Sequence, residues 1–328
     1  MDYKVSFYEN IDNKVRCKVC PHNCLINEGN FGVCRVRSVK HGKLFATNYG
    51  EVTSAAVDPI EKKPLYHYKP SKNILSIGSF GCNMTCSFCQ NYEISQNRPA
   101  TEFLEIDRLI SIIEDVNNNA GIAFTYNEPM MWYEYMFNAA KKIKEHNEEI
   151  GVVVVTNGYI NKEPLNELLP YIDAMNIDLK GYTNRYYNKI CGANLEPVLE
   201  SIKRCNDNCH VEITTLLVSD ENDSLEEIRN IAEFISSINE NIPLHLSRYF
   251  PRYKMENKAT RIDRIIEARD EAKKYLRYVY VGNVGGIYNN TYCTNCGEVI
   301  IKRNGYNTEV HLHDGRCDFC GRKTNIIQ

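Results

Sequence analysis

Short apolar runs alternate with longer stretches of helical period through the middle of this chain. The runs are rich in Val, Ile and Tyr and have the length of buried strands. They predict seven strands, at residues 74–79, 121–126, 151–156, 174–180, 211–218, 243–250 and 278–284. Continuous apolar character, in place of strict alternation with polar residues, is typical of a parallel sheet that is covered on both faces.

The segments between these runs carry apolar residues at helical spacing, and several begin near Ser or Asp. They predict helices at residues 104–117, 130–147, 164–170, 195–205, 224–240 and 258–275. Strands that alternate with helices form βαβ units, and six or seven units favour a partial (β/α)6-type barrel with active residues at the carboxyl ends of its strands. The rival is an open doubly wound sheet, but the chain lacks a glycine-rich dinucleotide loop.

The two ends of the chain are turn-rich and each contains four cysteines. Pro59, Pro64 and Pro70 mark the exit from the first of these regions. We therefore predict an N-terminal four-cysteine module at residues 1–70, the barrel at residues 71–287, and a C-terminal module at residues 288–328.

Composition narrows the class of protein. The net charge is −3, which gives no basic field for nucleic acid or anionic lipid. No apolar run reaches the roughly 18–20 residues of a membrane span, and the first residues lack the layout of a secretory signal. From the missing membrane span and secretory signal, we expect a cytoplasmic protein that does not contact a membrane. In a reducing compartment, the 14 cysteines indicate metal sites rather than disulfides.

Three cysteines stand close together after the first predicted strand. Cys82, Cys86 and Cys89 have the spacing Cys-x3-Cys-x2-Cys, and aromatic Phe88 precedes the last of them. Three thiolates can hold three irons of a [4Fe–4S] cluster, whereas electron-transfer ferredoxins close the cluster with four. An iron without a protein ligand can coordinate a substrate directly. The alternatives, zinc or free thiols, explain neither the aromatic residue nor the position at a strand end.

This triplet resembles the motif of the radical S-adenosylmethionine (SAM) superfamily. The resemblance implies that the amino and carboxylate groups of SAM chelate the open iron. It also implies that one electron, from reduced flavodoxin or ferredoxin, cleaves SAM to methionine and a 5′-deoxyadenosyl radical that abstracts hydrogen. The protein then orients SAM and excludes competing donors. Phe88 is expected beside the adenine.

Further segments are similar to the pyruvate formate-lyase activating enzymes. TYNEP (125–129) brings Glu128 to the methionyl ammonium of SAM, and TNG (156–158) and DLK (178–180) complete the pocket. The residues carried over are Glu128, Thr156, Asn157, Asp178 and Lys180. The alternatives are a carboxylate at a helix N-terminus for Glu128 and a solvated loop pair for Asp178 and Lys180.

Two positions depart from that branch. Val155 replaces the aspartate that precedes Thr-Asn-Gly in those activases, which puts their monovalent-cation site in doubt. Phe250 stands where they have a SAM-contacting histidine, with His245 as the nearest substitute. Over nearly the whole length, CPHNC, CQNYEISQ, VTNGYI, HLSRYFPRYK and the terminal cysteines resemble the AmmeMemoRadiSam system radical SAM enzyme. That resemblance implies Memo-type and AMMECR-type companion proteins.

The C-terminal cysteines have the pattern Cys-x2-Cys, twenty residues, Cys-x2-Cys. The ligands would be Cys293, Cys296, Cys317 and Cys320, and glycine follows each pair. This spacing is typical of a zinc ribbon, in which four thiolates hold one Zn²⁺ between two small hairpins. A rubredoxin-like iron site is the alternative. Ribbons often bind nucleic acid, but in an acidic chain the basic residues here favour a solvated face.

The N-terminal cysteines are less diagnostic. Cys17, Cys20, Cys24 and Cys34 have the spacing Cys-x2-Cys-x3-Cys-x9-Cys. Zinc is favoured, with an auxiliary iron–sulfur cluster or free thiols as alternatives, and His22 or His41 can replace one thiolate. The other three cysteines are interpreted as core residues. They are Cys191, Cys205 and Cys209. The alternative, in which Cys205 and Cys209 are one pair of a fourth metal site, lacks a second pair nearby.

The sequence therefore predicts a radical SAM enzyme that acts on an unidentified protein or small molecule. One alternative is a glycyl-radical-enzyme activase. The other is a zinc-ribbon nucleic-acid-binding or scaffold protein in which the triplet holds a structural cluster.

Overall fold

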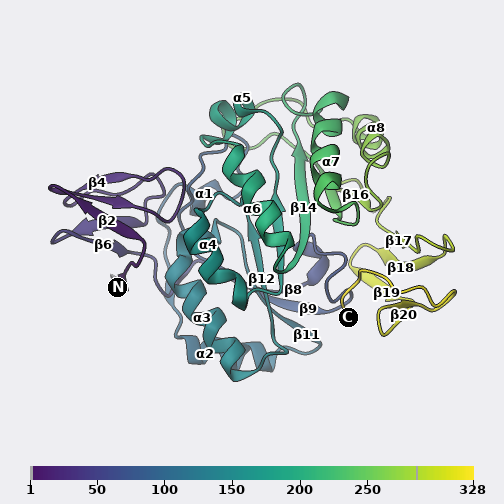
Figure 1. The fold of residues 1–328 in the computed structure, drawn as a ribbon, viewed down its shortest axis with the longest axis horizontal. Coiled ribbons are helices and arrows are strands. Elements are labelled where there is room, and N and C mark those ends of the chain that lie inside the picture. Colours follow the sequence, from purple (N-terminus) through teal and green to yellow (C-terminus); the bar gives the residue numbers. More distant parts are fainter. Residues whose placement is uncertain (1–2, 286) are drawn as a thin grey trace.

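The computed structural model describes residues 3–285 and 287–328. A central domain of helices around a sheet lies between two small β modules (Figure 1). The N-terminal module, in purple, and the C-terminal module, in yellow, lie on opposite sides of the central domain. None of the helices in the described ranges is long and apolar enough to cross a bilayer.

An eight-stranded sheet forms the centre of the molecule, in the order β16-β15-β14-β13-β12-β11-β9-β8. Its strands are β8 (Ser54–Pro59), β9 (Asn73–Gly78), β11 (Asn119–Phe124), β12 (Gly151–Thr156), β13 (Ala174–Asp178), β14 (His210–Leu217), β15 (Leu244–Arg248) and β16 (Val279–Gly282). The seven strands from β9 onward are parallel. All seven predicted strands are confirmed to within two residues. Their sequential order has no reversal, which excludes the doubly wound rival.

The predicted helices are also confirmed. They are α2 (Ile106–Asp115), α3 (Tyr133–His146), α4 (Lys162–Leu168), α6 (Glu196–Asn206), α7 (Leu225–Asn239) and α8 (Ile262–Ala272). Ser224 caps α7, because its side chain accepts a hydrogen bond from Glu227 N. Short elements that periodicity did not predict are η1 (Ile60–Lys62), α1 (Tyr92–Ser95), η2 (Pro129–Trp132), η3 (Leu169–Tyr171), α5 (Asn184–Tyr186) and the π-helical turn η4 (Tyr187–Cys191).

Strand β8 comes from the region before the predicted boundary at residue 70. It pairs antiparallel with β9 and forms one edge of the sheet. The chain then packs Ile60, Leu65 and Tyr68 against the first residues of β9 and β11, including Ile74 and Ala120. Residues 54–68 therefore belong physically to the central sheet and cover the amino ends of its strands.

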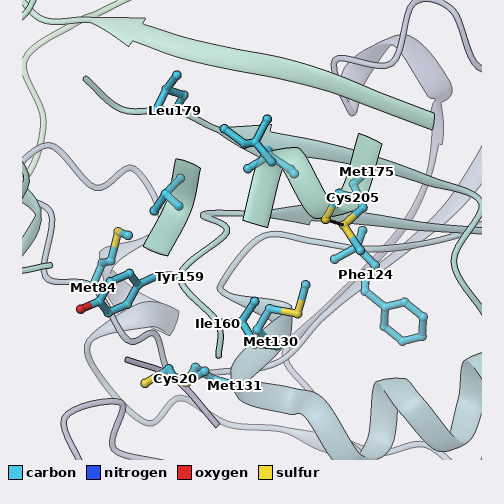
Figure 2. Close-up of a cluster of buried hydrophobic side chains, with 14 of the residues drawn as sticks. Cys20, Met84, Phe124, Met130, Met131, Tyr159, Ile160, Met175, Leu179 and Cys205 are labelled. Atoms are coloured by element: carbon cyan, nitrogen blue, oxygen red, sulfur yellow. Dashed lines mark hydrogen bonds between the residues drawn. The ribbon is translucent and has the colours of Figure 1, made fainter. Parts of the chain in front are cut away.

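The N-terminal module consists of two three-stranded sheets. One contains β1 (Tyr3–Lys4), β5 (Arg37–Lys40) and β6 (Lys43–Ala46), and the other β2 (Tyr8–Ile11), β3 (Lys14–Cys17) and β4 (Leu25–Asn27). A separate pair joins β7 (Glu51–Val52) to β10 (Glu102–Phe103). The module shares one hydrophobic core with the barrel, where Figure 2 draws Cys20 beside Met131 and below Tyr159 and Met84.

The C-terminal module has a small core of its own. Its strands are β17 (Thr291–Tyr292), β18 (Val299–Asn304), β19 (Asn307–Val310), β20 (Leu312–His313) and β21 (Arg316–Cys317). Six buried residues form this core, two of them cysteines. The module contacts the barrel through the segment that follows η1: Arg303 Nη2 donates to Tyr66 O at 2.7 Å, and Ile327 N donates to His67 O at 2.8 Å.

Candidate active site

The cysteine triplet lies on the loop that leaves the carboxyl end of β9. Gly81 begins this loop with φ +89°, a conformation that favours glycine. A Cβ on Gly81 would lie 2.5 Å from Val36 Cγ1 and 2.8 Å from the Cys34 carbonyl oxygen. Glycine is therefore required here both by the backbone and by the close approach of the N-terminal module.

A segment about one hundred residues further along the chain holds the same loop. Thr85 N donates to Cys191 O at 2.8 Å and Ser87 N donates to Ile190 O at 3.0 Å. Both carbonyls belong to the π-helical turn η4, a type of turn that is frequent at functional sites. The Cys191 side chain is buried, as predicted, but it also forms a hydrogen bond with Cys86, which lowers the Cys86 pKa.

A pocket of about 380 Å³ opens over the loop at the carboxyl ends of the parallel strands. This volume lies within the range of small-molecule sites. All three triplet cysteines line it. The pocket also brings together the six residues predicted to contact SAM, which are Phe88, Glu128, Thr156, Asn157, Asp178 and Lys180.

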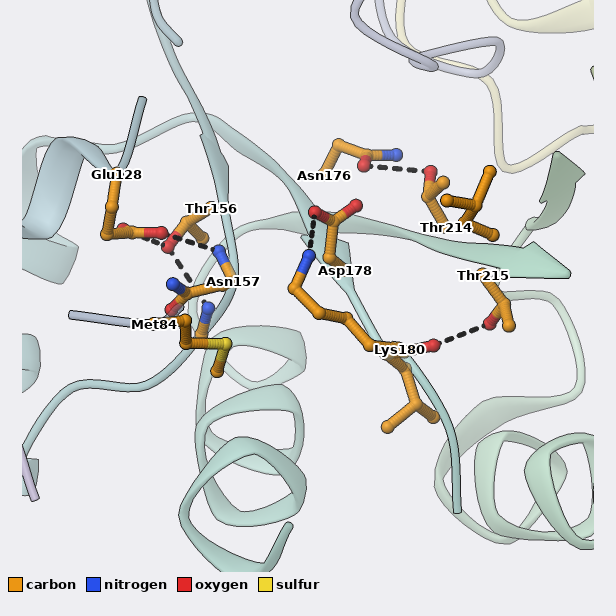
Figure 3. Close-up of polar contacts among 12 residues, drawn as sticks. Met84, Glu128, Thr156, Asn157, Asn176, Asp178, Lys180, Thr214 and Thr215 are labelled. Carbon is orange, nitrogen blue, oxygen red and sulfur yellow. Dashed lines mark hydrogen bonds and ion pairs between the residues drawn. The ribbon is translucent and has the colours of Figure 1, made fainter. Parts of the chain in front are cut away.

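Glu128 lies between β11 and η2 and is 2% exposed. Its Oε1 accepts a hydrogen bond from Thr156 Oγ1 at 2.6 Å and its Oε2 accepts one from Asn157 N at 2.8 Å (Figure 3). Oε1 also accepts a hydrogen bond from Met130 N at 3.0 Å. The bond from Met130 N caps η2, which is the alternative role considered for this carboxylate. Oε2 keeps one lone pair for a further donor.

Burial raises the pKa of Glu128 to about 7, because the three donated hydrogen bonds only partly offset the loss of water. A carboxyl with this pKa changes its charge near neutral pH. The electrostatics of the pocket therefore depend on pH in the physiological range.

Lys180 and Asp178 form an ion pair at the end of β13, with Lys180 Nζ 2.7 Å from Asp178 Oδ2 (Figure 3). Burial opposes the charge of Lys180, but the nearby Asp178 carboxylate and the Cys86 thiol raise its pKa well above the usual value. Lys180 Nζ also lies 5.8 Å from the centre of the Phe88 ring. The pair is partly buried at the pocket wall and is not the solvated loop pair of the alternative interpretation.

Two asparagines connect the triplet to its surroundings. Asn157 Nδ2 lies 3.8 Å from Cys82 Sγ and donates to Asn83 Oδ1 at 2.9 Å, while Asn83 Nδ2 donates to Tyr159 O at 2.6 Å. Met84 N is a second donor to Cys82 Sγ, at 3.3 Å. Burial and the nearby Glu128 carboxylate raise the pKa of the Cys82 thiol well above its usual value, and the hydrogen bond from Met84 N opposes this shift. Asn83 lies inside the triplet segment, but its spacing gave no sign of this role.

The mouth of the pocket contains further residues that the sequence did not single out. Tyr126 has φ +74°, a strained conformation for a bulky residue. Asn91 Nδ2 donates to its carbonyl oxygen at 2.6 Å, and the Lys63 ammonium lies 4.9 Å from the centre of its ring. Lys62 and Lys63 line the pocket, and each ammonium lies 2.9 Å from a carboxylate oxygen of Asp58.

The two departures from the activase pattern have different outcomes. Val155 lines the pocket, so an apolar side chain stands where those enzymes have a carboxylate. His245 lies on the same face of β15 as pocket-lining Ser247 but one strand repeat nearer the amino end, where its ring nitrogen lies 2.6 Å from Glu212 Oε2. It does not line the pocket, and Phe250 is 45% exposed. The expectation that His245 substitutes for the SAM-contacting histidine is therefore wrong.

The C-terminal cysteines form a tight group. The sulfurs of Cys293, Cys296, Cys317 and Cys320 all lie within 4.8 Å of one another. The glycines that follow each pair have positive φ, and their N–H groups donate to the carbonyls of Cys293 and Cys317 at 2.9 and 2.8 Å. These turns and distances fit one metal ion held by four thiolates.

Comparison with known proteins agrees with this geometry. Residues 76–235 match the family described as the Radical SAM superfamily. The uncharacterized protein MJ0808 of Methanocaldococcus jannaschii is 42% identical over 333 residues, with 98% of each chain covered. The 4-hydroxyphenylacetate decarboxylase activating enzyme of Clostridium scatologenes is 23% identical over 216 residues, which cover 61% of this chain and 68% of that enzyme.

The fold is also found among solved structures. A radical SAM methyltransferase from Sphaerobacter thermophilus superposes with a TM-score of 0.51 at 15% identity, covering 65% of this chain and 66% of the methyltransferase. The region that matches the family, residues 76–235, contains the triplet and the six residues predicted to contact SAM. This chain therefore belongs to the radical SAM superfamily.

Proposed function

We propose that this chain cleaves SAM reductively at a [4Fe–4S] cluster bound by Cys82, Cys86 and Cys89. The resulting 5′-deoxyadenosyl radical abstracts hydrogen from a protein or a small molecule. The observation that carries this proposal is that the three thiols share one pocket with the Glu128 carboxylate and the Lys180 ammonium. These two groups are complementary to the ammonium and carboxylate of an amino acid.

The residues present fit a cluster and SAM. Three cysteines face the pocket, and backbone and side-chain N–H groups approach Cys82 Sγ. When bound there, the cluster and SAM supply one-electron chemistry that the side chains of the protein lack. The pocket of about 380 Å³ is lined both by the three cysteines and by the residues that would contact SAM, so the cluster and SAM would share it.

Each pocket residue has a role in this proposal. Glu128 Oε2 accepts a charge-assisted hydrogen bond from the SAM ammonium. Lys180, kept charged by Asp178, pairs with the SAM carboxylate. Phe88 packs against the adenine, and Thr156 and Asn157 keep the Glu128 carboxylate in place through the hydrogen bonds described above.

Formation of 5′-deoxyadenosine tests the proposal. Anaerobically reconstituted protein, with dithionite and SAM, is expected to release 5′-deoxyadenosine and methionine, and a variant with Cys82, Cys86 and Cys89 all changed to Ala is expected to release neither. The Cys205→Ala variant is a matched control, because this buried thiol contacts Met175 in the core, away from the pocket. Release of no 5′-deoxyadenosine by iron-loaded protein would exclude the reaction. Salt-dependent RNA or DNA binding by that protein would favour the nucleic-acid alternative.

We expect the affinity for SAM to rise with pH between 6 and 8. Protonation of Glu128, whose pKa is about 7, removes the charge that pairs with the ammonium. The protonated form predominates at pH 6 and the carboxylate at pH 8, which predicts a dissociation constant about tenfold lower at pH 8. Titration of the reconstituted protein with SAM at both pH values measures this change.

The Glu128→Gln variant is the control for this titration. It keeps an oxygen for Thr156 and Met130 but does not titrate, so its affinity for SAM should be weaker and independent of pH, with unchanged iron content. An equally steep profile in this variant would assign the pH dependence to another group. A lower melting temperature with unchanged affinity would leave Glu128 as a capping residue alone.

The similarity to an activating enzyme supports a second candidate, a glycyl-radical-enzyme activase. A stable glycyl radical on a partner protein, detected by electron paramagnetic resonance (EPR), would distinguish it. We favour a different modification, because Val155 and Phe250 depart from the activase pattern and two modules flank the barrel. We propose that the chain acts in an AmmeMemoRadiSam system, with Memo-type and AMMECR-type companions.

Other parts of the proposal concern metals and compartment. The C-terminal site takes Zn²⁺, because four thiolates within 4.8 Å of one another suit a single tetrahedral ion. Reduced flavodoxin or ferredoxin supplies the electron. The cytoplasm is the compartment, because thiols stay reduced there.

A further inference from the structure

The four N-terminal cysteines gather around one small cavity. Cys17 ends β3, Cys20 and Cys24 lie in the connection to β4, and Cys34 precedes β5. All four line the cavity together with Arg37. Cys17, Cys20 and Cys34 are buried, and Cys24 is half-buried. Strand β3, its connection to β4 and the segment before β5 therefore bring their cysteine side chains to the same cavity.

The spacing of these sulfurs differs from that of the C-terminal set. In the chain as described, the C-terminal cysteines form the single group of metal-ligand side chains whose donor atoms all lie within 4.8 Å. Neither the N-terminal set nor the catalytic triplet meets this distance. A cluster of several irons separates its thiolates more widely than one ion does. The N-terminal set therefore resembles the triplet rather than the zinc site.

The open volume of this cavity is only about 10 Å³, so its size does not favour a cluster over a single ion. Four sulfurs at about 2.3 Å from one Zn²⁺ lie roughly 3.8 Å apart. The zinc that the sequence spacing favoured would therefore require side chains of this set to move inward. A cluster would require them to move apart.

A buried cation borders the cavity. The Arg37 side chain is 1% exposed, and its Nε has no hydrogen-bond partner among the described residues. Arg37 Nη1 binds Glu134 at 2.6 Å. A cluster held by four thiolates is anionic, and an unpartnered N–H of a buried guanidinium is a suitable donor to it.

We propose that Cys17, Cys20, Cys24 and Cys34 hold an auxiliary iron–sulfur cluster that transfers electrons to the catalytic cluster. The binding of the auxiliary cluster is independent of the proposed function, and the transfer rests on it. Four thiolates suit either a [2Fe–2S] or a [4Fe–4S] cluster.

The two cysteine sets are adjacent. The Cys34 carbonyl oxygen approaches Gly81, the residue before Cys82, to 2.8 Å from its Cβ position. His22, two residues after Cys20, has its Nε2 2.7 Å from the carbonyl oxygen of Asn83. The N-terminal module thus contacts the catalytic loop on both sides of Cys82. His22 Nε2 is occupied by this contact, and His22 does not line the cavity of the four cysteines.

Electron transfer from the donor through the auxiliary cluster to the catalytic cluster moves one electron and neither forms nor breaks a covalent bond. A low-potential donor of the flavodoxin or ferredoxin class loses one electron, which reduces the auxiliary cluster. That cluster is reoxidised when it passes the electron to the catalytic cluster. The auxiliary site lies on the module side of the loop, so a large donor protein does not have to enter the SAM pocket.

Metal analysis of the full-length triplet variant tests the site. With Cys82, Cys86 and Cys89 changed to Ala, the reconstituted protein should retain about two to four irons with equal sulfide. An EPR signal should appear on reduction. A second variant that also carries Cys24→Ser and Cys34→Ser should lose this iron, whereas adding Cys205→Ala instead should not. If the triplet variant instead contains no iron and two zinc ions per chain, the proposal is overturned.

Reduction kinetics test the transfer. In the variant Cys24→Ser, Cys34→Ser, the catalytic cluster should be reduced severalfold more slowly by reduced flavodoxin but at the wild-type rate by dithionite, which is small enough to reach the pocket. Circular dichroism checks the fold. Unchanged reduction by flavodoxin would overturn the transfer. If wild-type protein with both clusters loaded forms no 5′-deoxyadenosine, that result contradicts the proposed function. It does not contradict the auxiliary site.

Discussion

Cys293→Ser is expected to release about one zinc per chain and to unfold the C-terminal module while the barrel stays folded. The module has a core of only six buried residues, including Cys293 and Cys317. Such a core cannot fold by itself. Structural zinc contributes about 10–16 kcal/mol of binding free energy to small modules of this kind, so the loss of one ligand removes most of the stability.

Hydrogen exchange and metal analysis measure this effect. Protection should be lost from residue 291 onward and reduced around Tyr66 and His67, whose carbonyls accept hydrogen bonds from the module. Cys209→Ser is the control, since Cys209 belongs to no cysteine group. Unchanged zinc content, or loss of iron together with zinc, would contradict a separate C-terminal metal site.

Arg37→Met is expected to destabilise the protein by about 3–5 kcal/mol, because it leaves a buried carboxylate without its partner. Arg37 Nη1 binds Glu134 Oε2 at 2.6 Å, and the two side chains are 1% and 6% exposed. Arg37 lies in the N-terminal module and Glu134 in α3. The ion pair therefore joins the module to the barrel.

Thermal unfolding followed by circular dichroism should show a melting temperature lower by roughly 4–7 °C. The double variant Arg37→Met, Glu134→Leu is the informative control. Replacing both charges by apolar groups of similar volume is often neutral, so it should recover much of the loss. If neither Arg37→Met nor Glu134→Leu alone lowers the melting temperature, the ion pair contributes nothing to stability.

The sequence predicted the barrel well because its strands are buried on both faces. Runs such as GVVVVT have no polar alternation, and helices of clear period separate them. Strand β8 (SAAVDP) was missed because it lies at a sheet edge with three exposed residues in succession. Its pairing with β9 comes from tertiary contacts that its own composition does not reveal.

Site residues could be predicted from the sequence where their position at the end of a strand decides whether they reach the pocket. Glu128, Thr156 and Asp178 follow or end parallel strands, whose carboxyl ends meet at one edge of the sheet. Contacts between distant segments were not predictable. The approach of Cys191 to Cys86 and of His22 to Asn83 depends on how loops about 60 to 100 residues apart fold over each other.

Thr85 N and Ser87 N donate backbone hydrogen bonds to the turn at residues 190–191. Because of these bonds, the loop of the triplet and the C-terminal module are expected to differ in when they bind metal. The loop that carries the triplet is held by protein contacts alone, so its shape is present before iron arrives. A chelator should strip this loop of metal without denaturing the barrel, and iron should be restored without refolding. The C-terminal module needs its ion while it folds. We therefore expect the C-terminal module to bind its ion during folding, whereas the triplet can receive its cluster after the barrel has folded.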